Sequence, residues 1–133
     1  MSAYIIAWIV TALAFLGLDA VWLKRMWPRL YQPILGDITR APLNLSAALG
    51  FYVVYVSAIV FFAVTPALER GGLTKALLNG AIFGFAAYAT YNLTNQATLK
   101  AWDWRVTRAD MAWGTIVTAL AAAAAYAAAS SFA

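Results

Sequence analysis

Two aspartates stand inside long apolar stretches of this sequence, and each is followed three residues later by a tryptophan. Asp19 precedes Trp22, and Asp110 precedes Trp113. Residues three apart share a helix face, so each carboxyl group is expected beside an indole. Because a charged group in apolar surroundings is costly, both acids should face the interior, accepting hydrogen bonds or carrying a proton. Two such groups could hold a small polar solute, a lipid headgroup or protons.

A third apolar segment adds glycines, phenols and amides on one face. The residues that recur every four positions are Gly80, Gly84, Tyr88, Asn92 and Gln96, with Tyr91 and Asn95 on the flank. The glycines allow close helix approach, whereas amides exposed to lipid would lack hydrogen-bond partners. The amides should therefore turn toward the acids or the tyrosine hydroxyls. The predicted binding cluster comprises Asp19, Trp22, Tyr88, Tyr91, Asn92, Asn95, Asp110 and Trp113.

A purely structural interpretation of these polar residues stays open. Asp110 could cap the last helix and favour its N-terminal dipole end, and Asp19 could pair with Lys24, Arg25 or Asn92. The amides would then only hold helices together.

The composition excludes several kinds of chemistry. The sequence contains no cysteine and no histidine, which removes thiolate nucleophiles, disulfides and the commonest ligands of zinc, haem and di-iron centres. We expect no cofactor and no metal. No nucleophile motif indicates catalysis, and whether the protein is an enzyme is left open, with the balance against it.

The proportions of the chain predict a membrane protein. Of 133 residues, 65% are hydrophobic and 11% charged, a balance that one water-soluble core of this size cannot hide. Four apolar stretches are each near the length that crosses a bilayer as a helix. We expect an all-α fold, one domain over 1–133, with both termini on one side. The predicted spans are 3–23, 47–68, 75–95 and 109–129, and residues 24–46 form an interfacial connection.

The basic residues predict an orientation. Seven of the nine Lys and Arg residues fall in or beside 24–46 and 96–108, and two flank the connection between the second and third spans. Positive loops stay in the cytoplasm, which places the termini in the periplasm of a bacterial inner membrane. The net charge of +4 is explained in this way, and no nucleic-acid partner is expected.

Two connections differ in character. The segment 65–72 has Pro66 near a helix end and the pair Gly71 and Gly72, which predicts a tight hairpin and adjacent second and third helices. Residues 26–36 mix aromatic, basic and aliphatic side chains between Pro28 and Pro33, a composition suited to the headgroup layer.

The sequence resembles a bacterial family of predicted membrane proteins known as domain of unknown function 2177. The resemblance covers nearly the whole chain and is carried by the segments 18–23, 51–55, 87–95 and 110–115. Relatives often have Asp at the position of Asn92, so a third carboxylate is not required here. The family implies no reaction, although its members often accompany genes for lipid modification.

Three functions are compatible with these features. The first is a membrane-embedded binding or transport protein whose polar cluster lies in the cytoplasmic leaflet, with membrane lipids as partners and a homodimer as one way to enclose a pathway. The second is an enzyme or accessory in membrane lipid or fatty-acid modification, with the two acids as acid and base. The third is a scaffold with a membrane-protein partner.

Overall fold

The computed structural model describes residues 2–40 and 42–133, so Ala41 of the predicted interfacial connection lies outside the described residues. The described chain is helical and forms four long helical segments. Its elements are α1 (Ser2–Met26), η1 (Trp27–Tyr31), α2 (Gln32–Leu35), η2 (Gly36–Ile38), α3 (Leu45–Ile59), η3 (Val60–Val64), α4 (Thr65–Glu69), α5 (Gly72–Thr98), α6 (Trp104–Ala129) and η4 (Ser130–Phe132).

Three of these segments are long and apolar enough to cross a membrane by length and composition. They are Ser2–Ile38, Leu45–Glu69 and Trp104–Phe132. The amide-bearing helix α5 is not among them. The structure therefore has the four long helical segments that were predicted, but only three of them are apolar enough to be candidate spans.

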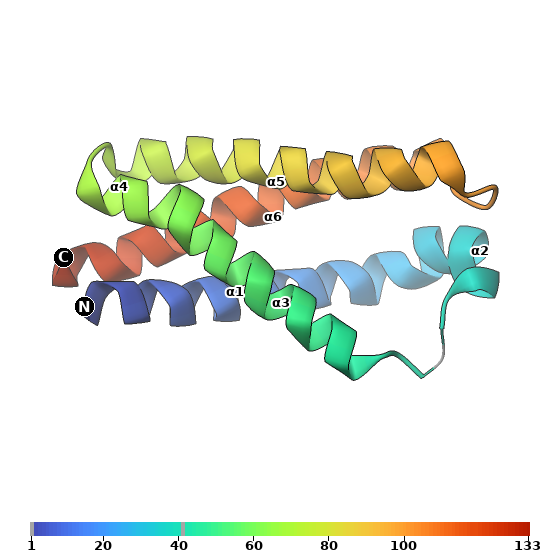
Figure 1. Cartoon of the computed structure of the whole chain (residues 1–133), viewed down its shortest axis with the longest axis horizontal. Coiled ribbons are helices and arrows are strands. Elements are labelled where there is room, and N and C mark those ends of the chain that lie inside the picture. The colour runs from blue at the N-terminus through green and yellow to red at the C-terminus, as the bar shows by residue number, and fades with distance from the viewer. Residues whose placement is uncertain (1, 41) are drawn as a thin grey trace.

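The helices run antiparallel in chain order, with α6 at the centre of the bundle. It packs against α1 on one side and α5 on the other, which are the two most extensive contacts between helices. Figure 1 shows the N- and C-terminal ends together with the α4–α5 turn at one end of the molecule. The first connection and the α5–α6 connection lie at the opposite end.

The first helical segment is longer than predicted, because the predicted interfacial connection 24–46 begins as helix. From Trp27 to Ile38 the chain continues as π, α and 3-10 helix rather than as a loop between prolines. Pro28 and Pro33 both lie at helix starts, and Gln32 N–H donates to Trp27 O across the wider π turn. A π turn relieves the clash that a proline ring makes with the preceding helical turn, so the helix continues past both residues.

The turn between α4 and α5 is the predicted tight hairpin. Gly71 and Gly72 have φ values of 114° and 64°, in a region that glycine enters without penalty. However, within the second long helical segment α5 is contacted mainly by η3 and α4, and hardly by α3. The second and third long helical segments are therefore neighbours only near the turn.

Glycines bring α5 and α6 into close contact. A Cβ atom on Gly80 would lie 3.0 Å from Ala119 Cα, and one on Gly84 would overlap the backbone of Gly114. A Cβ on Gly114 would in turn overlap the ring of Tyr88. The small residues of the predicted α5 face therefore serve packing.

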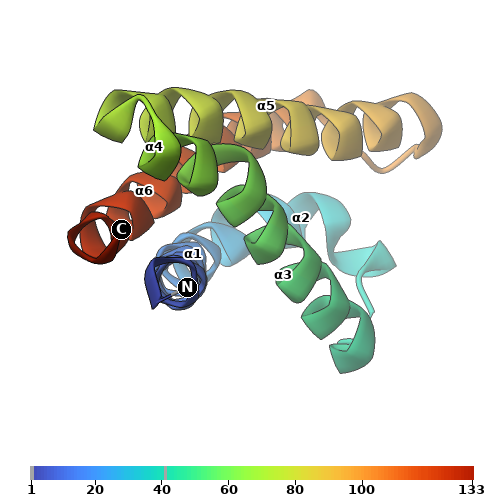
Figure 2. The same cartoon turned by 60° about the vertical axis from the view of Figure 1, so that its left-hand side comes forward.

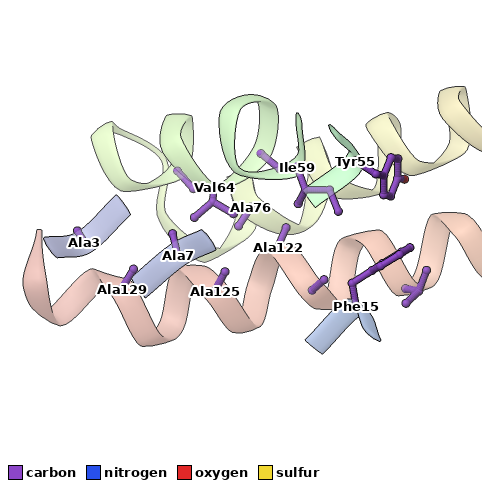
Figure 3. Packing of buried hydrophobic residues seen from close by; sticks show 14 residues of the cluster. Ala3, Ala7, Phe15, Tyr55, Ile59, Val64, Ala76, Ala122, Ala125 and Ala129 are labelled. Atoms are coloured by element: carbon purple, nitrogen blue, oxygen red, sulfur yellow. The ribbon is translucent and has the colours of Figure 1, made fainter. Parts of the chain in front are cut away.

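Small side chains also fill the core near the chain ends. Ala7, Ala122 and Ala125 are fully buried against Ile59 and Val64, as Figure 3 shows. The alanine-rich helix thus packs on neighbouring helices of its own chain.

The first half of α3 leaves the bundle. Figure 2 shows it diverging from α1. Leu49 in this half is 64% exposed, whereas Ile59 at the end of α3 is fully buried. The bundle is therefore closed at the α4 end and open beside the start of α3.

The last helix begins five residues earlier than predicted. Its N-cap is Asp103, whose side chain accepts a hydrogen bond from Arg105 N–H. Asp110 consequently lies inside α6, and its interpretation as a cap is wrong.

Candidate functional site

The two predicted acids are held by donors from the opposite helix. Trp113 Nε1 on α6 donates to Asp19 Oδ1 on α1 at 2.9 Å. Trp22 Nε1 on α1 donates at 2.8 Å to Tyr31 OH, which donates at 2.7 Å to Asp110 Oδ1 on α6. Each indole therefore acts on the acid of the other helix and not, as the spacing predicted, on the acid of its own.

The two tryptophans are also in direct contact. Their ring centroids lie 4.7 Å apart with an interplanar angle of 3°, so Trp22 stacks flat on Trp113. Because α1 and α6 are antiparallel, this places Trp113 level with Asp19 and Trp22 level with Asp110. Three residues of helix correspond to about 4.5 Å, so Asp19 lies about one turn deeper than Asp110.

Asp110 has donors on both of its oxygens. Asn92 Nδ2 on α5 donates to Asp110 Oδ2 at 2.6 Å and to its own helix at Tyr88 O at 2.9 Å. Asn92 is fully buried, and its Oδ1 has no donor among the described residues. The structure thus brings together residues from α1, η1, α5 and α6 around this acid.

A cavity of about 350 Å³ lies beside the acids. Every long helical segment contributes to its wall, which is formed by Asp19, Phe51, Tyr55, Ala87, Tyr88, Tyr91 and Asp110. Asp19 Oδ2 accepts no hydrogen bond from the part of the chain that the structure describes, so this oxygen is available to a ligand. The carboxyl groups share this space although they are held by different helices.

A second cavity of about 300 Å³ lies on the side of the first connection. Asp110 and Tyr91 line both cavities, and the remaining wall comes from Trp27, Tyr31, Leu35, Ile38, Thr39 and Trp102. Asp110 therefore stands between a cavity near the connections and a deeper one that reaches Asp19.

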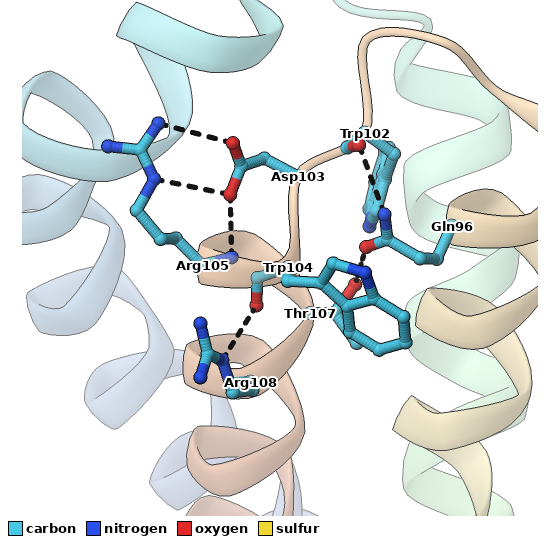
Figure 4. Close-up of polar contacts among 7 residues, drawn as sticks. All are labelled: Gln96, Trp102, Asp103, Trp104, Arg105, Thr107 and Arg108. Carbon is cyan, nitrogen blue, oxygen red and sulfur yellow. Dashed lines mark hydrogen bonds and ion pairs between the residues drawn. The ribbon is translucent and has the colours of Figure 1, made fainter.

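The α5–α6 connection fixes the end of the bundle beside this second cavity. Gln96 Nε2 donates to Trp102 O at 3.2 Å, and Thr107 Oγ1 donates to Gln96 Oε1 at 2.7 Å (Figure 4). Arg105 pairs with Asp103 at 3.1 Å, and its guanidinium holds the pKa of that carboxyl below its usual value. Gln96 thus bonds to the connection and does not join the acids.

Some predicted contacts are not made. The only ion pair in residues 2–40 and 42–133 is Arg105–Asp103, so the pairing of Asp19 with Lys24 or Arg25 is wrong. No hydrogen bond joins Asn95 to the acids within the described chain, and Tyr91 is 57% exposed while lining both cavities. A binding role for the cluster stays a prediction.

Several residues of the site were not in the predicted cluster, among them Tyr55 and Ala87, which line the larger cavity. Tyr31 was assigned to the headgroup layer, but it is only 7% exposed and links Trp22 to Asp110. Phe51 lines the cavity from the diverging part of α3. The burial of Tyr31 could not be predicted from the sequence, because it depends on the helix continuing through Pro28 and Pro33.

Within the two described ranges, no three His, Cys, Asp or Glu side chains cluster closely enough to hold a metal ion. The groups that the site offers a ligand are carboxylates, an amide, phenols and aromatic rings.

Apolar helices with an inward polar cluster define an integral membrane protein of the helical-bundle class. The chain belongs to the family described as "Predicted membrane protein (DUF2177)", whose family model matches residues 4–127. The resemblance seen in the sequence is thereby confirmed. No curated protein and no solved structure matches the chain.

Proposed function

We propose that this protein is a membrane-embedded binding protein that holds a small polar group between its long helices. The observation that supports this most directly is the 350 Å³ cavity, where carboxyl groups from α1 and α6 meet aromatic residues from α3 and α5. Ligand sites commonly have this size, with a largely apolar wall and a few convergent polar groups. Acids inside membrane proteins commonly mark a ligand or ion pathway.

The proposal places all four long helical segments across the bacterial inner membrane as one domain. Although α5 carries amides, it packs along α6 through Gly80 and Gly84 and exposes Ile82 and Phe85 on its other side. Because α5 packs along a spanning helix and has an apolar outer face, we expect it to cross the membrane at the same depth as α6. The basic connections then lie in the cytoplasm and both termini in the periplasm.

Cysteine labelling tests this topology, because the native sequence contains no cysteine. Single variants Asp37→Cys, Arg70→Cys, Lys100→Cys and Ser131→Cys place one thiol at exposed sites in each connection and at the C-terminal end. An impermeant maleimide should label positions 70 and 131 in intact spheroplasts, and positions 37 and 100 only after permeabilisation. If positions 70 and 100 react alike, α5 does not cross and the four-span proposal fails.

Native mass spectrometry tests the binding function. The full chain, released from its membrane in a mild detergent, should retain a small-molecule or lipid adduct. Asp19→Asn should lose this adduct because Asp19 presents a free carboxylate oxygen to the cavity. Asp37→Asn is the matched control, since Asp37 is exposed in η2 and outside the cavity wall. Equal retention by wild type and Asp19→Asn would contradict the proposal.

A further inference from the structure

The 350 Å³ cavity has negative groups but no positive one. Asp19 and Asp110 are its only ionisable acids, and none of its lining residues is Lys or Arg. The ion pair of the described chain, Arg105–Asp103, lies at the α5–α6 connection instead. Acids inside a membrane protein normally face a cation or a neutralising partner. A cationic ligand would supply the missing countercharge.

Aromatic rings make up most of the remaining wall. Tyr55 stacks on Phe51 with centroids 5.5 Å apart, and it meets Tyr88 edge to face at 6.1 Å and 73°. Tyr91 completes the group. Rings set at different angles around a carboxylate are the recurrent environment of ammonium groups, because the negative face of each ring attracts the cation.

Acceptors without donors point to the same chemistry. Asp19 Oδ2 accepts no hydrogen bond from any described residue. The fully buried Asn92, which holds Asp110, also has an Oδ1 without a donor. The site therefore has spare acceptors. The indoles of Trp22 and Trp113 and the phenol of Tyr31 already donate around the acids, and Tyr55 OH lies 2.8 Å from Thr118 Oγ1. The hydroxyls of Tyr88 and Tyr91 make no hydrogen bond in the part of the chain that the structure describes.

The cavity wall includes side chains on the exposed surface of the bundle. Phe51 on α3 and Tyr91 on α5 both line the cavity and are 56% and 57% exposed. In a membrane-spanning bundle this surface faces lipid. An apolar body attached to the bound group could therefore stay in lipid while the group itself reaches Asp19.

We propose that the ligand is an ammonium group carried on an apolar body, bound between Asp19, Asp110 and the ring group formed by Phe51, Tyr55, Tyr88 and Tyr91. This inference rests on the proposed binding function and specifies its ligand class. A lipid headgroup and a free organic cation both carry such an ammonium group, and both would satisfy the same carboxylates and rings.

Binding of a defined probe tests the charge requirement. The full chain is placed in nanodiscs of phosphatidylglycerol, which has no amine, and titrated with benzyltrimethylammonium and with its uncharged isostere neopentylbenzene. Saturable binding of the cation alone, followed by tryptophan fluorescence, is expected because Trp113 contacts Asp19. Equal binding of the neutral compound, or no binding of the cation, would overturn the proposal.

Variants locate the site. Asp19→Asn and Tyr91→Leu should each weaken cation binding about tenfold, whereas Tyr91→Phe, which keeps the ring, and Asp37→Asn should not. Tyr91 is 57% exposed, so its substitution leaves the buried core intact even if Asp19→Asn proves unstable. Unchanged affinity in Tyr91→Leu and Asp19→Asn would contradict the site.

A third arm separates the two sources of the ammonium group. If the natural ligand is a lipid, phosphatidylethanolamine in the nanodisc should compete with the cation and stay bound in native mass spectra. If it is a free cation, phosphatidylethanolamine should have no effect. An Asp19-dependent adduct without any ammonium group would refute this inference while leaving the proposed binding function standing.

Discussion

At the scale of single residues, the donors to Asp19 and Asp110 distinguish the two acids. Asp110 accepts hydrogen bonds on both oxygens, from Tyr31 and Asn92, whereas Asp19 accepts one, from Trp113. A carboxyl group whose oxygens are all engaged is positioned by the protein, and one with a free oxygen can engage a ligand. Under the proposed function, Asp110 organises the site and Asp19 meets the ligand with its free oxygen.

The indole N–H of Trp113 can be removed while its ring contact with Trp22 is largely kept. Trp113→Phe should lower the free energy of unfolding by about 1 to 3 kcal/mol, because a partly buried carboxyl group loses its protein donor. Trp104→Phe, at a 55% exposed position, should have little effect. Thermal unfolding in detergent measures both. The effects of Trp113→Phe and Asp19→Asn should also be strongly non-additive, and additive effects would contradict their contact.

Asp103 provides a test of helix capping and of pH dependence. Its pKa is lowered chiefly by the Arg105 side chain, so the charged form stabilises the folded state above the usual value of 3.8. That contribution is lost as the pH falls through the lowered value. Asp103→Asn keeps a capping side chain but loses the ion pair, while Asp103→Ala loses both. At neutral pH the melting temperature should fall more for Asp103→Ala than for Asp103→Asn. In acid the melting temperatures of the wild type and Asp103→Asn should become equal.

Sequence reasoning at this scale found the acids and Asn92 but not how they are connected. Spacing along one helix placed each indole beside the acid of its own helix. Instead, Trp113 bonds across to Asp19 on α1, and Trp22 reaches Asp110 on α6 through the Tyr31 hydroxyl. Which partner a side chain selects depends on the register of two helices, and no pattern within one helix contains that register. Tyr31 could not be placed for a similar reason, since its burial follows from a helix that passes two prolines.

At the scale of helices, close packing of α5 on α6 depends on glycine. Gly114→Ala would drive a methyl group into the ring of Tyr88, which lines the cavity. We expect a loss of about 1 to 3 kcal/mol in unfolding free energy together with weaker ligand binding, because the ring must move. Gly17→Ala is the matched control, since a Cβ there meets nothing within 4 Å and should raise stability slightly.

Helix positions followed from apolar length, but helix ends did not. The turn at Gly71 and Gly72 was predictable because glycine pairs have a specific backbone preference. The start of α6 was placed five residues late because Trp104, Arg105 and Arg108 are polar or interfacial in character, although they are helical. Membrane-spanning helices commonly extend beyond the hydrocarbon, and hydropathy reports the apolar part alone.

At the scale of the whole molecule, the arrangement separates a packed part from a loose part. α1, α5 and α6 make the most extensive helix contacts, whereas the first half of α3 is exposed. The sequence marked an inner face only on α5, through its glycines and amides. The other helices have apolar residues on all sides, so the loose packing of α3 could not be predicted.

Spin labels test this division. A pair at Ala20 and Ala112, both exposed on α1 and α6, should give a narrow distance distribution. A pair at Leu49 and Leu93, on α3 and α5, should give a broad one, because few contacts restrain the start of α3. Benzyltrimethylammonium should narrow only the second distribution. Equally narrow distributions without the cation would show that α3 is held as firmly as the other helices.

The crossed bonding of the two tryptophans limits how the bundle can move. If α6 slid along α1 by one turn, or rotated about its axis, the Trp113–Asp19 bond and the Trp22–Tyr31–Asp110 chain would break together, and the stacked rings would part. These two helices therefore behave as one rigid frame. Any opening that admits a molecule to Asp19 has to come from the segments around that frame, and the first half of α3, where Leu49 is 64% exposed, is the candidate segment.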